Sequence, residues 1–461
     1  MKRVKLSHGL RALLLSLTVI ALAVLLLLGV GSVTGRLTRF DMSDQGYYTL
    51  SDESEALLTA LDTEVELVLL AVEGSEDLTL QYLLQRYADA SEHIDFRVID
   101  PAAESELAAE YAENLRYSNS VAVVSGERST LVDYSELYVN DYSAFYESGD
   151  TGDIQSSFCA ERALTGAIRY VTAEELPCLY ALTGHGEVSL GEEMLRQLRT
   201  EGIRLETLDL SETEAVPSGH GAVLIHAPSY DISEAERDKL AAYLAEGGEM
   251  ILITAYSGEP LTELNALMEP YGKLTEGLVV EQDRDHYVYG YYDCLVPELA
   301  EHELTAALAE QQAYVVLPGC QGILPAEDAA ASPLLTTSAA AYASTDLGSV
   351  GIKEGDISGP LTVGALIEKG GSRVIWYSSG FMLNETYTQS FGGANEELFL
   401  ESVRYLCGGT ALDIPAKGIQ QELLTLTLPQ GMALGALVTL VIPLTVVITS
   451  AVVVIRRRRR A

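Results

Sequence analysis

The stretch "AVLIHAPSYDISEAERDKLAAYLAEGGEMILI", residues 222–253, contains a complete strand–helix–strand unit. Its apolar ends, AVLIHAP and EMILI, have the length of buried strands rather than of helices. Between them, Ser233 and Glu236 form an S-x-x-E capping box at a helix start, and the pair Gly247-Gly248 ends the helix. Short connections between alternating strands and helices predict a parallel sheet with helices on both faces. We therefore expect an α/β fold.

The same alternation extends upstream. The stretch "LYALTGHGEVSLGEEMLRQL", residues 179–198, predicts a strand, a tight turn and a helix. The turn consists of Gly184, His185, Gly186 and Glu187. Because α/β proteins bind ligands beyond the carboxyl ends of their strands, this turn is the candidate functional site.

The turn permits a catalytic and a structural interpretation. In the catalytic one, His185 acts as a base and Glu187 as a ligand or orienting group, which requires a nucleophile nearby. However, Cys178 begins a strand instead of following one, and the chain has no G-x-S-x-G motif. In the structural one, Gly184 and Gly186 supply backbone freedom, and the following helix offers free N–H groups to an anion or a partner's carboxylate. We predict no catalytic residue, and ligand or partner contact at Gly184, His185, Gly186 and Glu187.

Other motifs argue against several kinds of site. The spacing of His220 and His226 relative to His185 does not indicate a metal site. Five cysteines are scattered without a CxxC pair, which supports neither a zinc site nor a disulfide framework. There is no Walker A motif, so another chain would have to hydrolyse ATP if transport is involved. We predict no metal and no cofactor.

The segment before the quoted stretches has its own pattern. Residues 37–155 alternate as strand, helix, strand, helix and two further strands, an order similar to a thioredoxin-like domain. Without a CxxC motif, thioredoxin redox chemistry is excluded. A linking helix at 156–175 is expected to lead into the second α/β module at 176–412. Within that module, residues 260–350 are weakly patterned, and the end predicts a hairpin around Gly370-Gly371 followed by a helix.

Both ends of the chain are predicted to meet a membrane. Residues 12–33 and 432–455 carry no charge, and about 20 such residues form a helix that crosses a bilayer. Basic residues lie in the segment 1–11 before the first span and in the poly-Arg tail 456–461 after the second, and basic flanks stay in the cytoplasm. We therefore predict a two-pass cell-membrane protein with both termini cytoplasmic. The two modules and a juxtamembrane linker, 413–431, would lie outside the cytoplasm.

Charge is distributed unevenly along the chain. Of the 29 Lys and Arg, eleven lie at the two ends, whereas all 67 Asp and Glu lie between the predicted spans. Such an acidic body repels nucleic acid, so we predict no nucleic-acid partner. The acidity suits solubility outside the cell, and the alternative is a cationic partner or bound divalent ions.

Several stretches in this order resemble GldG-type auxiliary subunits of ABC transporters. They are "FDMSDQGYYTLSDESEALLTALDTEVELVL", "ERALTGAIRYVT", "LYALTGHGE", "LIHAPSYDISEAERDKLAAYLAEGGEMILI", "VIWYSSGFMLNE" and "GGANEELFLESVRYL". The resemblance covers roughly residues 40–255 and 360–461. It implies an ABC-2 type permease and a cytoplasmic ATPase as partners, and a second module like class I glutamine amidotransferases.

The expected function is that of a non-catalytic, extracytoplasmic auxiliary subunit of an ABC-2 type transport system. One alternative is a membrane-anchored binding or sensor protein that acts without a transporter. The other is a cell-surface hydrolase on an amidotransferase-like scaffold, whose activity would require His185 and Glu187. The transported substrate is not indicated by any of these patterns.

Overall fold

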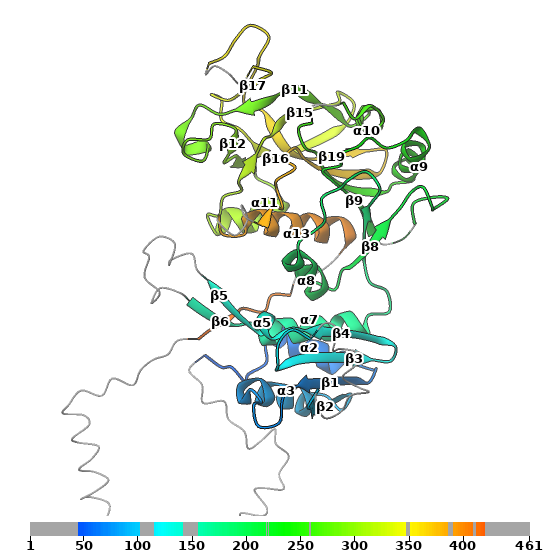
Figure 1. The fold of residues 1–461 in the computed structure, drawn as a ribbon, viewed down its shortest axis with the longest axis vertical. Coiled ribbons are helices and arrows are strands. Elements are labelled where there is room, and N and C mark those ends of the chain that lie inside the picture. The colour runs from blue at the N-terminus through cyan, green and yellow to red at the C-terminus, as the bar shows by residue number, and fades with distance from the viewer. Residues whose placement is uncertain are drawn as a thin grey trace, which may run out of the picture. The chain divides into compact units, whose positions relative to one another are not determined.

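The computed structural model describes residues 45–101, 115–141, 155–217, 219, 221–257, 260–346, 351–385, 391–408 and 412–419. Among these residues, no helix combines the length and the apolar character needed to cross a bilayer. The predicted spans and the basic tails lie outside the described residues. The described elements form a mixed α/β fold, as the sequence predicts (Figure 1). Their strands form a four-stranded sheet, a twelve-stranded sheet and two smaller sheets of two and three strands.

The small module is built on a four-stranded sheet with the order β2-β1-β3-β4. Strand β1 runs parallel to β2 and antiparallel to β3, and β3 runs antiparallel to β4. The strands are β1 (Val65–Leu70), β2 (Ile94–Ile99), β3 (Ser120–Ser125) and β4 (Arg128–Val132).

Capping residues and the spacing of apolar residues determine where the helices of this module begin and which face they bury. Helix α2 (Asp52–Ala60) begins after Ser51, whose side chain accepts a hydrogen bond from the N–H of Ser54. Helix α3 (Leu78–Ala90) connects β1 to β2 and is capped by Asp77. Its 3.6-residue pattern places one apolar face against the sheet, with Leu80, Leu83, Leu84 and Tyr87 all buried.

The predicted linking helix at 156–175 is wrong at its start. Residues Gln155–Phe158 form strand β6, which pairs antiparallel with β5 (Tyr138–Asp141), and helix α7 spans only Ala160–Thr172. A partner strand that is distant in sequence overrides the local helical pattern there. Helix α7 packs on β3 and β4 and is thus a layer of the small module. The short helix α5 (Tyr134–Leu137) and strand β21 (Lys417–Gly418), beside β6, complete this part.

The large module contains five parallel strands with the order β8-β7-β9-β10-β20. They are β7 (Cys178–Leu182), β8 (Arg204–Leu208), β9 (Gly221–His226), β10 (Glu249–Ile253) and β20 (Ser372–Tyr377). The predicted hairpin is confirmed, because β19 (Thr362–Lys369) pairs antiparallel with β20 around Gly370-Gly371.

The weakly patterned region 260–350 extends the sheet beyond β19. Its strands run antiparallel to their neighbours, and several contain only two or three residues, too few for an alternating pattern. In the large sheet they are β11 (Gly272–Val280), β13 (Glu298–Leu299), β15 (Gln321–Pro325), β16 (Ala330–Thr336) and β17 (Tyr342–Ser344), with β18 (Ile357–Ser358) following. Strands β12 (Cys294–Leu295) and β14 (Leu317–Pro318) pair with each other in a separate two-stranded sheet. The 3-10 helix η3 (Arg284–His286) lies among them.

Helices cover both faces of the large sheet, as the short strand–helix connections predict (Figure 1). On one face α8 (Glu192–Thr200), α11 (Glu303–Glu310) and α13 (Ala394–Cys407) share one apolar core. On the other face α9 (Glu234–Ala245) and α10 (Thr262–Met268) share the second.

The two modules meet where α7 packs against α8. A Cβ atom on Gly166 would lie 2.4 Å from the carbonyl oxygen of Thr200, so only glycine allows this approach. Beside it, the buried carboxylate of Glu201 contacts Arg162 of α7 at 2.9 Å and Arg404 of α13 at 3.3 Å. Close packing and a shared carboxylate therefore join three helices.

The beginning and the end of the described chain also meet. Lys417 Nζ donates to the carbonyl oxygen of Thr49 at 2.7 Å and to Oε2 of the buried Glu161 at 2.6 Å. Glu161 also accepts hydrogen bonds from the N–H of Ser51 and from Ser54 Oγ. We call this group the stem clamp, because it joins the segments that lead to the two predicted spans.

Candidate functional site

The strand order creates a topological switch point between β7 and β9. The chain leaves β7 toward β8 on one side and returns to β9 on the other, so the two connections diverge at the carboxyl edge. In sheets of this kind, a crevice for ligands lies at that point. The predicted turn, Gly184 to Glu187, directly follows β7 there, and His226 and Ala227 end β9 beside it.

The two glycines of the turn have the structural role that the sequence predicts. Gly184 has a φ of +114° and Gly186 a φ of +71°, conformations that side chains with a Cβ rarely adopt. The carbonyl oxygen of His185 accepts hydrogen bonds from the N–H groups of Ser229 at 2.9 Å and Tyr230 at 2.8 Å. The turn is therefore fixed to the segment that follows β9.

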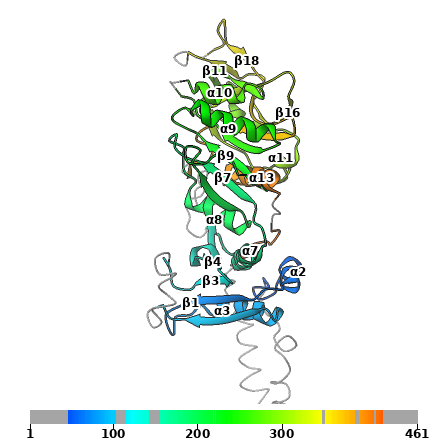
Figure 2. The same cartoon turned by 90° about the vertical axis from the view of Figure 1, so that its right-hand side faces the viewer.

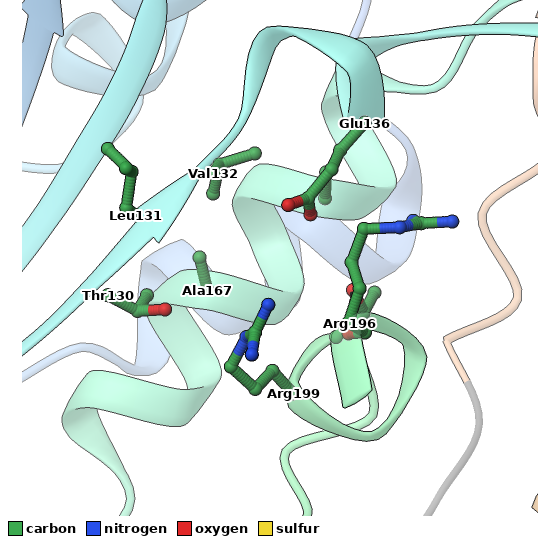
Figure 3. A pocket seen from close by; sticks show the side chains of 9 residues that line it. Thr130, Leu131, Val132, Glu136, Ala167, Arg196 and Arg199 are labelled. Carbon is green, nitrogen blue, oxygen red and sulfur yellow. The ribbon is translucent and has the colours of Figure 1, made fainter. Parts of the chain in front are cut away.

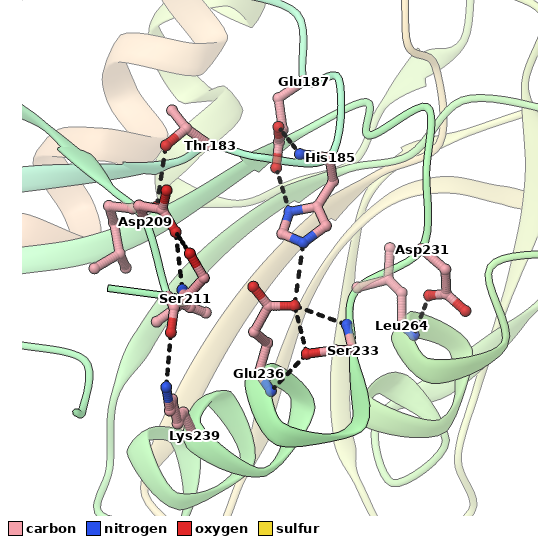
Figure 4. Close-up of polar contacts among 12 residues, drawn as sticks. Thr183, His185, Glu187, Asp209, Ser211, Asp231, Ser233, Glu236, Lys239 and Leu264 are labelled. Carbon is pink, nitrogen blue, oxygen red and sulfur yellow. Dashed lines mark hydrogen bonds and ion pairs between the residues drawn. The ribbon is translucent and has the colours of Figure 1, made fainter. Parts of the chain in front are cut away.

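His185 lies between two carboxylates, as Figure 4 shows. Its Nδ1 lies 3.0 Å from Glu187 Oε1, and its Nε2 lies 3.2 Å from Glu236 Oε2. The backbone N–H of His185 also donates to Glu187 Oε2 at 2.8 Å. A ring with both nitrogens facing carboxylates satisfies both contacts as donor only when both nitrogens carry a proton. His185 is only 7% exposed, so its nitrogens are used inside the protein.

Glu236 belongs to the predicted capping box, which the structure confirms. Ser233 donates to Glu236 Oε2 from its N–H and from its Oγ, both at 2.7 Å. Burial opposes ionisation of Glu236, but the bonds from Ser233 and the contact with His185 outweigh it and lower the pKa of this carboxyl. The first turn of α9 is therefore occupied by side chains of the chain itself.

The helix that the sequence predicts after the turn is present as α8. Helix α8 begins only at Glu192, after Gly191, whereas His185 contacts the start of α9. The reason is that the chain after Glu187 continues along β9, where the N–H of Val188 donates to the carbonyl oxygen of His226. An anion held by α8 at this turn is thus not supported.

Ala227 occupies the strained position at the end of β9. Its φ of +47° is unusual for a residue other than glycine, and its N–H bonds to the carbonyl oxygen of Ile253 in β10. Hydrolases of α/β type place their nucleophile on a strained strand-to-helix turn. In this chain, the side chain at that position is a methyl group.

The histidines are not brought together. His226 follows Ala222 and Leu224, which belong to the core beneath α8 and α13, so strand alternation directs its ring to that face, whereas His185 contacts α9. His226 is 3% exposed, and within the described chain neither ring nitrogen has a hydrogen-bond partner. Burial lowers the pKa of His226 to about 4, although the backbone of Val188 acts in the opposite direction. His220 lies outside the described residues.

The five cysteines are all free. Cys178 is at the amino end of β7, the opposite end from Gly184. Burial raises the pKa of the thiols of Cys178 and Cys294, to about 11 for Cys294, which disfavours the nucleophilic thiolate. The described residues include no group of three or more His, Cys, Asp or Glu arranged to hold a metal ion.

Sequence reasoning missed two features of this site. Glu236 was visible as a capping residue, but its contact with His185 joins residues 51 positions apart. The second is an exposed apolar rim, formed by residues that follow four parallel strands. Its members are Val188 (50% exposed), Tyr230 (71%), Tyr256 (47%) and Phe381 (52%). Each of these residues follows the end of a strand. That position places them at the same edge of the sheet only once the order of the strands is known.

Comparisons with known proteins concern parts of the chain. A family model described as a domain of unknown function (DUF7088) matches residues 44–140, which fall in the small module. None of the curated proteins matches the chain.

Among solved structures, the mmIFT52 N-terminal domain is similar over 52% of this chain and 99% of its own, with 16% identity and a TM-score of 0.37. A cytoplasmic protein from Salmonella typhimurium is similar over 51% of this chain and 100% of its own, with 13% identity and a TM-score of 0.34. PurLQS from Thermotoga maritima is similar over 50% of this chain and 100% of that chain, with 12% identity and a TM-score of 0.27.

Proposed function

We propose that the chain is a non-catalytic, extracytoplasmic auxiliary subunit of an ABC-2 type transport system. It spans the membrane at 12–33 and 432–455, contacts a separate permease through these spans, and works with a separate cytoplasmic ATPase. The small module is a thioredoxin-like domain without CxxC, consistent with its sheet order β2-β1-β3-β4. The large module is amidotransferase-like, with a doubly wound order and no nucleophile at Ala227.

The stem clamp is the observation that carries this proposal. Lys417 binds Thr49 and Glu161, so the first and last described segments lie together. The segments that lead to the two predicted spans therefore start next to each other on the folded part of the chain. This arrangement suits a protein that is anchored in one membrane by two spans. If the segments at Thr49 and Lys417 moved, the contacts that Glu201 makes with α7 and α13 would transmit that movement to the large module.

The enclosure of His185 in the turn supports a non-catalytic role. A general base needs a nitrogen that can reach the proton of a substrate. Both ring nitrogens of His185 face Glu187 and Glu236, and the ring is almost completely buried. The turn then serves as a rigid corner, and the exposed residues around it, such as Tyr230, are the part that meets a partner.

Co-purification tests the proposal. The full-length chain, tagged and extracted in detergent from its own cells, is expected to retain a permease and a Walker-motif ATPase. A matched variant with the second span, residues 432–455, replaced by an unrelated apolar span should lose them. Purification of the chain without either partner would favour the alternative, a binding or sensor protein that acts alone.

Topology is tested separately. Protease added to intact cells without their wall should digest the acidic body. If the body survives there and is cut only after lysis, the predicted orientation is wrong and the auxiliary role fails with it.

A further inference from the structure

Strand β4 ends the small sheet, and its outer edge is unpaired. Its two-residue turn from β3 places Ser125 opposite Arg128, and Val123 opposite Thr130. In this antiparallel register, alternate residues of β4 bond to β3, and Ser129 and Leu131 direct their backbone N–H and C=O groups outward. Over the described residues, these outward groups make no hydrogen bond. An unpaired edge of this kind is a template for another strand.

A cleft of about 580 Å³ opens along this edge, between β4 and α5 on one side and α8 on the other. Figure 2 shows α8 beyond β4, on the side away from β3. Helix α8 turns its buried residues, Met194 and Leu198, into the large module, and so presents its outer face to the cleft. At the inner end, a cavity of about 10 Å³ lies among β4, α7 and α8 (Figure 3). The cleft is thus wide beside the strand edge and narrow toward α7.

The acidic groups of the cleft already have partners. Glu192 pairs with Arg116 at 2.8 Å, and Glu193 pairs with Arg196. Asp133 accepts hydrogen bonds from Ser135 as the cap of α5, and Glu136 completes that capping box. Burial raises the pKa of Glu136, although nearby arginines oppose this.

Arg199, on α8, lines this cleft and acts electrostatically on Glu136. Within the described chain, its guanidinium makes no hydrogen bond and no ion pair, and Figure 3 shows it beside Arg196 and below Glu136. A guanidinium group carries five N–H donors in a rigid planar arrangement that matches the two oxygens of a carboxylate. Arg199 thus carries a positive charge without an ion-pair partner among the described residues, in a chain whose net charge is −38.

We propose that the cleft binds an extended peptide segment of a partner protein, which adds a strand to β4 and places an acidic side chain on Arg199. The outward N–H and C=O groups of Ser129 and Leu131 hold the peptide backbone, and the guanidinium selects the acidic residue. β4 has five residues, so a segment of about five residues matches its length. This proposal does not depend on the transport role.

The test measures binding of fluorescein-labelled pentapeptides to the full-length chain in detergent, by fluorescence anisotropy up to millimolar peptide. The probe is Thr-Val-Asp-Val-Thr. Its comparisons are Thr-Val-Lys-Val-Thr and the acidic peptide with N-methylated backbone amides, which cannot donate hydrogen bonds to β4. We expect the acidic peptide to bind, and each comparison peptide to bind at least 10-fold more weakly.

Variants assign the contact to Arg199. Arg199→Ala should weaken binding of the acidic peptide at least 10-fold, and Arg199→Lys should restore part of it. Arg204→Ala, which removes an exposed arginine from β8, is the matched control and should leave binding unchanged. Absence of binding at millimolar peptide overturns the proposal, and so does undiminished binding by the N-methylated peptide or by Arg199→Ala.

Discussion

Replacing Lys417 with Met tests the stem clamp. The substitution keeps most of the volume of the side chain but removes the ammonium group that binds Thr49 and Glu161. The pair is well buried, with the side chain of Glu161 4% exposed and that of Lys417 15% exposed. Burial by itself disfavours the charged form of Glu161, but Lys417 and Ser51 outweigh it and hold the pKa of its carboxyl below its usual range.

The expected loss follows from these contacts. Removing one partner of a buried ion pair costs about 3–5 kcal/mol, because the other charge stays buried without compensation. The N–H of Ser51 and Ser54 Oγ continue to donate to Glu161, so we expect the lower end, about 3 kcal/mol. The folded-state pKa of Glu161 is depressed, so its stabilisation is present above the unfolded pKa and is lost as pH falls through the folded pKa. In the variant this acid loss should begin at a higher pH.

Urea unfolding of the full-length chain in detergent, followed by circular dichroism, gives the free energy of unfolding. The matched control is Lys353→Met, which removes the exposed pair with Asp346 and should cost about 0–1 kcal/mol. The double variant Lys417→Met with Glu161→Leu should recover part of the loss, because no charge remains buried. If Lys417→Met is as stable as Lys353→Met, the reasoning about the clamp is refuted.

Three further substitutions test the packing and the site. Gly166→Ala places a methyl group against the carbonyl of Thr200 and should lower the urea-unfolding free energy by about 1–3 kcal/mol; no loss would contradict the close approach of α7 and α8. Ser233→Ala removes the cap of α9 and should cost about 1–2 kcal/mol by the same measurement. For His226, burial holds the folded pKa near 4 against an ordinary 6.5, so the unfolded chain binds the proton first, and stability should fall by up to about 3 kcal/mol between pH 6.5 and pH 4. His226→Leu should remove that part of the pH dependence, and an unchanged pH profile would contradict a buried neutral ring.

Much of the fold could be predicted because its signals are local. The capping box of α9, the glycines that end its helix and the hairpin at Gly370-Gly371 each lie within a few residues of the element that they define. The glycine-bounded turn around His185 was found in the same way, and so was its position after a strand. Such features report the burial and backbone geometry of one segment.

The contacts of the site could not be predicted in the same way. Glu236 meets His185 because β9 lies beside β7, and strand order is a property of the whole sheet. Residues 156–158 are predicted as the start of a helix, because their pairing with β5 lies outside the local pattern. The two- and three-residue strands between 294 and 344 are too short to carry any period.

The sequence by itself determined the α/β class, the bounds of the well-capped helices and the place of the turn at a strand end, because hydrophobic period and capping act within a few residues. Only the tertiary structure decided that His185 is enclosed by two carboxylates, that Lys417 joins the two stems, and that Arg199 faces an unpaired strand edge. Each of these depends on which distant segments pack together, and that is set by the burial and pairing of the whole chain rather than by any one segment.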